Sequence, residues 1–488
     1  MEGKHVPRCG RYRFFIAFLM LLAMFLIYSM KLNLGMAMVC MVNHTAYAEE
    51  RVNLVSKVEH DAKCSKIDDV DSAAEAGYTG TLLWSPSMQS ILFSSVFYGA
   101  FITSVPSGYL ADVFDPKKML FLSLLIIAIT TLLGPFFADM SFTAFLISRF
   151  ILGLGEGSTF PTMVSIASRW CPPADRSTIM AIFTSGTQIA GMLSGIISSS
   201  LCQLEFLGGW RLIFYVYGTL GIVWLVSWTV LATSEPIDNK WISDKEKKYI
   251  IEEVRHAHRA KTSNSNVPWK SMLTSSPCWA IGFAWFASNF SVVIISSIIP
   301  SYFRDILQLD LRRNGLFTIL PFVAQLIMKL SNGMISDYIR RKGFLSHNAT
   351  CKLFQSIGSF GTAIAFAILA LFVDCSNPYF ALFILSVQGL LYTATIAGWT
   401  TSLVTICPEH SGMLTSIGML FGLTGSSLAP LIYGLLTKFF PGYAYTLLFL
   451  ICSVIDIAAG MFFVFFGEAT IQPWSQSQPL PTQIALNE

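Results

Sequence analysis

Long apolar runs separated by short polar breaks dominate this chain of 488 residues. A run of about 20 apolar residues is long enough to cross the hydrocarbon core of a bilayer as a helix. Twelve such runs occur, at 14–42, 83–107, 118–138, 141–166, 177–201, 210–232, 275–303, 315–336, 351–373, 378–403, 411–437 and 442–466. The pattern therefore predicts an all-α membrane protein with twelve transmembrane helices.

Two long polar segments divide these spans six and six. The segment 43–82 follows the first span, and 233–274 separates the two halves. The second segment is charged and helix-prone, so it predicts a linker helix. The predicted organisation is a short N-terminus 1–13, a six-helix bundle 14–232, the linker 233–274, a second six-helix bundle 275–466 and a disordered, Pro/Gln-rich tail 467–488.

A similar motif follows the second span of each half. The first half reads GYLADVFDPKK from Gly108, and the second reads GMISDYIRRK from Gly333. An internal repeat in a twelve-span chain indicates two pseudo-symmetric bundles around a site at the membrane midplane. The aspartates of the motif, Asp112 and Asp337, are predicted gating residues, since each can cap a helix end at the membrane surface. The alternative is an ordinary basic loop between helices.

Basic residues are concentrated in the loops on one side of the predicted membrane. They include the N-terminus and the loops around Lys117, Arg169 and Arg340. The positive-inside rule makes this side cytoplasmic, and an even number of spans places both termini there. The segment 304–313 is an exception, because it is basic yet falls on the predicted outer side.

The polar segment 43–82 is then external or lumenal. It opens with the glycosylation sequon at Asn43, on the side where glycosylation occurs. Cys64, Cys202 and Cys375 also fall on this side, and a Cys64–Cys202 disulfide is one pairing that the sequence leaves open.

Composition excludes several classes of function. Only 12% of residues are charged and the net charge is +3, which is too small to indicate a nucleic-acid partner. The ten cysteines form no metal-binding pattern. Neither a phosphate-binding glycine loop nor an HExxH or GxSxG motif is present, so we predict no enzymatic activity and no cofactor.

Ionisable residues inside the spans are the main candidates for function. Each costs about 2.5–3.5 kcal/mol at the bilayer centre on insertion scales, so it usually faces a cavity or a partner. Lys31 lies deep in the first span beside Asn33. Arg149 and Glu156 are two helical turns apart and project from one face of the fourth span. We expect Lys31, Asn33 and Arg149 to bind an anion, and Glu156 to take part in coupling.

Each of these residues also has a purely structural interpretation. Lys31 could pair with a structural acid or extend to the membrane surface, and Arg149 could pair with Glu156 to fix helix packing. The glycines between Arg149 and Glu156 predict a tight helix contact or a backbone that lines the cavity. Asp456 in the last span is expected to be structural, and Lys329 to extend to the cytoplasmic surface without a further role.

Four segments together carry a family resemblance. They read MKLNLGMAMVCMVN, RFILGLGEGSTFP, SRWCPPADRS and GGWRLIFYVYG, in the first span, the fourth span, the loop after it and the sixth span. They resemble the anion:cation symporters of the major facilitator superfamily, which include sodium–phosphate cotransporters, sialin and vesicular glutamate transporters. The resemblance implies the major facilitator fold, alternating access, anion binding at Arg149, and coupling or gating at Glu156.

The resemblance extends to further positions and departs at others. Tyr98 matches an aromatic lining position of the second span, and Asn289 matches a common residue of the seventh. Lys31 stands where the family usually has arginine. Phe93 and Ser288 stand where the vesicular glutamate transporters have histidine and arginine, which argues against glutamate as substrate. The segment SLVTICP replaces a family motif that carries histidine and aspartate, so coupling is expected to differ.

The sequence favours a secondary active transporter of small organic anions or phosphate, driven by sodium, protons or membrane potential. A carrier of neutral solutes and a non-transporting sensor are the alternatives. The expected partners are the anion, a coupling ion and the lipid bilayer, with one chain as the transport unit. The N-terminus has no acidic dileucine signal, which favours the plasma membrane over vesicular or lysosomal membranes.

Overall fold

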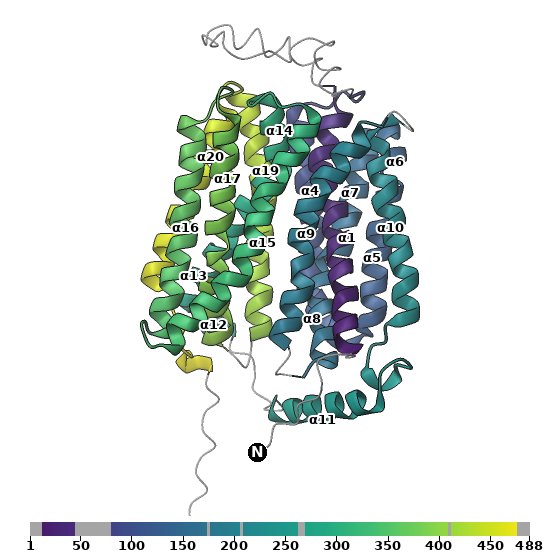
Figure 1. Ribbon diagram of the computed structural model, residues 1–488, viewed down its shortest axis with the longest axis vertical. Coiled ribbons are helices and arrows are strands. Elements are labelled where there is room, and N and C mark those ends of the chain that lie inside the picture. The colour runs from purple at the N-terminus through teal and green to yellow at the C-terminus, as the bar shows by residue number, and fades with distance from the viewer. Residues whose placement is uncertain are drawn as a thin grey trace, which may run out of the picture.

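The computed structural model describes residues 12–43, 80–172, 176–204, 208–261, 269–407 and 411–475. Long helices run side by side in two bundles, and short connections join them at two opposite faces (Figure 1). The start of α1, the linker helix α11 and the last described residues all lie at one face. We call it the terminal face, and the other the opposite face.

The first bundle corresponds to the six predicted spans of the first half. Several of its helices begin at side-chain caps: Ser85 accepts a hydrogen bond from Met88 N, and Asp115 accepts one from Lys117 N with Pro116 as the first helical residue. The helices are α1 (Tyr12–Met41), α4 (Pro86–Val113), α5 (Pro116–Leu132), α6 (Gly134–Met140), α7 (Phe142–Gly157), α8 (Thr159–Trp170), α9 (Arg176–Cys202) and α10 (Trp210–Leu231).

The predicted linker helix is present as α11 (Asp244–Lys261), preceded by η3 (Pro236–Asp238) and followed by α12 (Trp269–Thr274). Glu246 of α11 accepts hydrogen bonds from the backbone N–H groups of Tyr12 and Arg13, at 2.8 and 3.4 Å. A carboxylate at this place satisfies the free donors of the first turn of α1 and complements the positive end of its dipole. Arg13 also lies 3.9 Å from Glu246, so α11 is attached to the first bundle.

The second bundle repeats the six-span plan with two local departures from α-helix. Spans seven and ten each contain a π-helical turn, a feature often found at functional sites. The elements are α13 (Ser276–Val293), η4 (Ile294–Ile298), α14 (Ile299–Asp305), α15 (Leu311–Arg341), α16 (His347–Phe372), α17 (Pro378–Tyr392), η5 (Ile396–Thr400), α18 (Thr401–Ile406), α19 (Ser411–Phe439), α20 (Ala444–Phe466) and η6 (Pro473–Ser475).

Most of the predicted spans meet the length and hydropathy expected of membrane helices. Among the described residues, ten do so as single helices, and α5 with α6 does so as a pair bent by 47°. The predicted fourth span, which carries Arg149 and Glu156, consists of α7 and α8 in succession. It is not among the helices that meet the length and hydropathy expected of a membrane span. The all-α membrane fold is therefore confirmed, whereas the count of twelve and the cytoplasmic side of the termini stay predictions.

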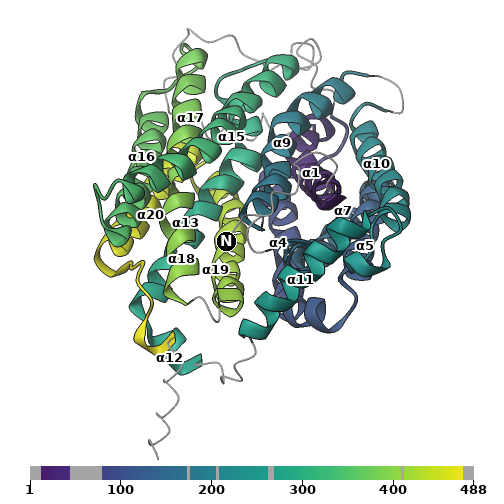
Figure 2. The same cartoon turned by 60° about the horizontal axis from the view of Figure 1, so that its bottom comes forward.

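The two bundles meet along two helix pairs, α4 with α19 and α9 with α15, as Figure 2 shows from the terminal face. Towards the opposite face, α1 also packs against η4 and α14. Gly35 makes this approach possible, because a Cβ there would lie 2.9 Å from the carbonyl oxygen of Ser296. In the described part of the chain, α8 and α18 do not pack extensively on each other, whereas α1 joins the second bundle through η4 and α14.

Two sequence expectations change at the surfaces. The basic segment 304–313 carries its own counter-charges: Arg304 lies 2.7 Å from Asp305, and Arg313 lies 3.2 Å from Asp310. The tail was expected to be disordered from residue 467, but 467–475 lie on the second bundle, where Gln472 N donates to Ile406 O. The rest of the tail lies outside the described residues.

Candidate functional site

An ion pair joins α1 and α7 of the first bundle. The Lys31 ammonium is 2.5 Å from Oε1 of Glu156, and only 14% and 10% of the two side chains are exposed. The Phe97 ring centroid lies 4.5 Å from the same ammonium, within cation–π distance. The second carboxylate oxygen of Glu156 is buried and has no hydrogen-bond partner among the described residues. Lys31 is thus paired with an acid, as one sequence alternative proposed.

Arg149 is buried and turns towards α1. Its guanidinium donates to Met30 O at 3.3 Å and to Asn33 Oδ1 at 3.4 Å. It also lies between two aromatic rings, 5.1 Å from Phe145 and 5.2 Å from Phe214. No described carboxylate lies within ion-pair distance of it, so the Arg149–Glu156 pair that the sequence allowed is not formed here. In this arrangement Arg149 joins α7 to α1.

The glycines of α7 bring it close to its neighbours. A Cβ at Gly153 would lie 2.0 Å from Val96 O of α4, and one at Gly157 would lie 2.4 Å from Ala100 O. Neither position has room for a side chain without moving α4. Of the two interpretations that the sequence left open, the structure shows the tight helix contact.

Other predicted binding residues lie apart from the ion pair. Tyr98 is 43% exposed and shares the exposed apolar face of α4 with Ile102 and Val105, while its neighbour Phe97 contacts Lys31. Asn289 donates to Trp285 O at 3.1 Å within α13 and lies against α19. The described contacts do not join Tyr98 or Asn289 to Lys31.

The repeated motifs lie at the terminal-face ends of α4 and α15. The side chains of Asp112 and Asp337 are outside the described part of the structure. A neighbouring acid, Asp115, accepts a hydrogen bond from Ser234 Oγ, and Lys117 Nζ donates to Thr229 O at 3.0 Å. These contacts tie the start of α5 to the last turn of α10 and to the segment after it.

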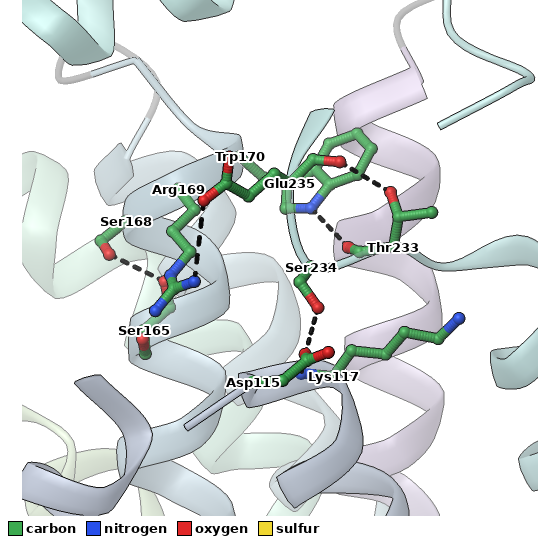
Figure 3. A network of polar contacts seen from close by, with 9 residues as sticks. All are labelled: Asp115, Lys117, Ser165, Ser168, Arg169, Trp170, Thr233, Ser234 and Glu235. Carbon is green, nitrogen blue, oxygen red and sulfur yellow. Dashed lines mark hydrogen bonds and ion pairs between the residues drawn. The ribbon is translucent and has the colours of Figure 1, made fainter. Parts of the chain in front are cut away.

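The end of α8 joins the same network, as Figure 3 shows. Arg169 lies 3.9 Å from Glu235, and Trp170 Nε1 donates to Thr233 O at 2.9 Å. The sequence pointed to Arg169 as a basic loop residue and to both Arg169 and Trp170 through the motif SRWCPPADRS, but it did not identify their partners after the sixth span. The network fixes three spans of the first bundle at the terminal face.

The opposite face holds a disulfide that the sequence did not identify. Cys202 at the end of α9 is bonded to Cys40 at the end of α1, so the open alternative Cys64–Cys202 is not the pairing observed. Cys40 lies within the predicted first span, so the sequence does not place it among the outer-side cysteines. In the structure it lies one residue before the end of α1, where it meets Cys202 at the end of α9. Asn43 lies two residues after the end of α1, and its backbone N–H donates to Leu82 O at 2.8 Å. The rest of its sequon lies outside the described residues.

Two further charges in the second bundle have clear positions. Asp456 is buried and accepts a hydrogen bond from Ser291 Oγ at 2.9 Å, which joins α20 to α13 and fits the expected structural role. Lys329 does not extend to the surface. Its ammonium donates to Gln188 Oε1 at 3.1 Å and to Thr184 Oγ1 at 3.3 Å, both on α9 of the first bundle.

Comparison with known proteins places this architecture in a family. The model of the Major Facilitator Superfamily matches residues 13–354. The chain belongs to the major facilitator superfamily. Human sialin is 29% identical over 97% of the chain and 93% of its own length. The putative inorganic phosphate cotransporter of Drosophila melanogaster is 30% identical over 96% of the chain and 88% of its own length. Within the superfamily, the chain therefore matches the anion:cation symporters.

Solved structures of this superfamily share the fold. The inward-open xylose transporter XylE from E. coli has a TM-score of 0.65 at 15% identity, covering 93% of this chain and 96% of that one. An inward-facing bacterial homologue of the human lysosomal transporter Spinster has a TM-score of 0.62. At this identity the likeness shows the fold alone. As a member of the superfamily, the chain is a multi-pass membrane protein and a secondary active transporter.

Proposed function

We propose that this transporter carries a small organic anion or inorganic phosphate, and that Glu156 couples anion movement to a cation. The supporting observation is the buried Lys31–Glu156 pair, whose carboxylate keeps one oxygen without a hydrogen bond. A buried carboxylate with unused acceptor capacity is suited to gaining a proton or contacting a cation. Relatives named as sialin and as sodium-dependent phosphate transport protein 1 support the same substrate class.

The Lys31–Glu156 pair suggests how binding of the transported anion depends on the coupling cation. While Glu156 is ionised it occupies the ammonium of Lys31, and an anion would have to compete with it. When a proton or cation neutralises Glu156, the Lys31 charge becomes available to an anion. The hydrogen bond from Arg149 to Asn33 holds α1 against α7 during this exchange, and the guanidinium of Arg149 adds positive potential near Lys31. Binding of anion and cation is therefore mutually favourable, as linkage requires of a symporter.

Alternating access follows from the arrangement of the bundles. The α4–α19 and α9–α15 pairs form the contact along which the halves would rock, and the α1–η4 contact would open towards the opposite face. In this proposal Asp112 and Asp337 act as gating residues at the terminal face. Tyr98 and Asn289 would reach the anion in another state of the cycle, since here they lie apart from Lys31.

Uptake into proteoliposomes tests the proposal. The labelled panel is phosphate, urate, glutamate, sialic acid and a neutral sugar, each with a sodium gradient, a pH gradient or a membrane potential in turn. We expect saturable uptake of one anion that depends on one gradient. Lys31→Met should abolish this uptake, and Lys438→Met, at an exposed lysine in the last turn of α19, serves as the control.

Glu156→Gln separates coupling from binding. It removes the competing charge, so we expect tighter anion binding and retained anion exchange, but no stimulation by the driving gradient. Uptake of the neutral sugar alone by a folded, correctly oriented protein would refute the anion proposal. Unchanged gradient dependence in Glu156→Gln would refute the coupling role.

The remaining assignments are part of the same proposal. We place the transporter in the plasma membrane, with glycosylation at Asn43 and one chain as the working unit. Surface labelling of intact cells would test the plasma-membrane assignment. A mobility shift after deglycosylation, absent in Asn43→Gln, would test glycosylation at Asn43.

A further inference from the structure

We propose that Lys329 is an anion-binding residue contributed by the second bundle, a role that rests on the anion transport proposed above. Its ammonium lies between the bundles, where it donates to Gln188 Oε1 and Thr184 Oγ1 across the α9–α15 contact. Both acceptors are neutral. An anion that enters between the bundles could therefore take their place without displacing another charge.

Lys329 differs in its surroundings from Lys31 and Arg149, the two cations of the first bundle described above. Lys31 is neutralised by Glu156 at 2.5 Å, and Arg149 is enclosed by Phe145 and Phe214. No described carboxylate lies within ion-pair distance of Lys329. A cation this deep in a membrane helix is costly unless it faces water, a counter-charge or a substrate pathway. Two neutral hydrogen bonds compensate only part of that cost.

The α9–α15 contact is tight on one side of Lys329. Towards the opposite face, a Cβ at Gly191 would lie 2.4 Å from the Phe322 ring, and one at Gly315 would lie 2.1 Å from Ser199 Oγ. Helix packing therefore closes that route in this state. Closer to the terminal face, the contact between α9 and α15 contains polar side chains: Lys329 of α15 donates to Gln188 and Thr184 of α9.

The position of Lys329 along α15 gives its depth. It lies twelve residues before Arg341, so about 18 Å of helix separates it from the terminal-face end. Because Lys329 lies at the α9–α15 contact between the bundles, rocking of the two halves would expose its ammonium to an anion. We infer that the anion exchanges between Lys329 and Lys31 as the bundles rock, with Gln188 and Thr184 holding the ammonium when no anion is bound.

Anion binding can be measured apart from transport. Purified full-length protein in detergent is titrated with inorganic phosphate or urate, and the rise in melting temperature is followed. The anion that stabilises the wild-type protein and is transported by it is the probe. We expect Lys329→Met to raise the half-stabilising concentration at least tenfold, and Lys329→Arg, which keeps the charge, to change it less than threefold.

Two further variants exclude simpler explanations. Lys352→Met is the matched control, because Lys352 is also a half-buried lysine of the second bundle but donates to Val464 O away from the contact between bundles. We expect it to bind like wild type. Gln188→Met removes a partner of Lys329 and keeps its charge. It should bind the anion as tightly as wild type or more tightly, whereas a mere fastening role for Lys329 would make it behave like Lys329→Met.

The outcomes separate the two proposals. Wild-type binding and transport that persist unchanged in Lys329→Met would overturn the role of Lys329 alone. Equal losses in Lys329→Met and Gln188→Met would assign Lys329 to holding the bundles together. A wild-type protein that neither binds nor transports any anion of the panel would overturn the anion proposal, and the role of Lys329 with it.

Discussion

The Lys31–Glu156 pair should show strong energetic coupling in a double-mutant cycle. At 2.5 Å and an effective dielectric constant of about 20, Coulomb attraction amounts to about 7 kcal/mol. Desolvation of the two ions offsets much of it, and removing one partner of a buried pair typically costs about 3–5 kcal/mol because the other charge is left uncompensated. We therefore expect Lys31→Met and Glu156→Gln each to lower the free energy of unfolding by about 3–5 kcal/mol.

The double variant removes both charges, so no uncompensated charge remains buried between α1 and α7. We expect it to be less destabilised than either single variant, which gives a coupling free energy of at least about 3 kcal/mol. Unfolding by SDS titration in mixed micelles measures all four proteins under one condition. The matched control is the Arg211–Asp139 pair, which is also short, at 2.8 Å, but 31% and 46% exposed. Exposed pairs contribute about 0.2–1 kcal/mol.

The reasoning fails if the two single effects simply add. Additivity within about 0.5 kcal/mol is the behaviour of residues that do not interact. It would mean that the contact seen between α1 and α7 is not the one that stabilises the first bundle. The exchange of Glu156 for an anion on Lys31 would then lose its structural basis.

Three further variants test the surroundings of this pair with the same unfolding assay. Arg149→Lys keeps the charge but loses the planar fork, so we expect a loss of about 1.5–3 kcal/mol; an unchanged midpoint would contradict the role of Arg149 in joining α7 to α1. Removing the Cys40–Cys202 disulfide, which closes a separation of 162 residues, should cost about 2–5 kcal/mol, and no difference with and without reductant would argue against the bond. Gly153→Val should cost at least about 1–3 kcal/mol by separating α4 from α7; tolerance of valine would show that this contact is loose.

Much of the fold could be predicted from apolar runs. The first predicted span, 14–42, corresponds to α1 at Tyr12–Met41, because a run of this length has few ways to be satisfied in a bilayer. Bends are less visible. The 47° break between α5 and α6 lies within one apolar run, and only the Gly134–Pro135 pair signals it. The π-turns of spans seven and ten left no recognisable signal.

The candidate site was predictable as a set of residues but not as a set of contacts. Lys31, Arg149 and Glu156 stand out because charges are rare in spans. Their spacing along the chain cannot tell which carboxylate meets which cation, since that depends on the rotation of α1 against α7. The sequence predicts that Lys329 extends to the cytoplasmic surface without a further role, because its partners on a helix of the other half cannot be identified from the sequence.

The attachment of α11 to α1 changes the effective length of the connection between the halves. The polar segment 233–274 has the length of a long, loose linker. Because Glu246 binds the first turn of α1, α11 moves with the first bundle up to Lys261. The tether that remains to Trp269 spans eight residue steps, or about 28 Å at full extension. That reach sets an upper limit on how far the two bundles can part at the terminal face.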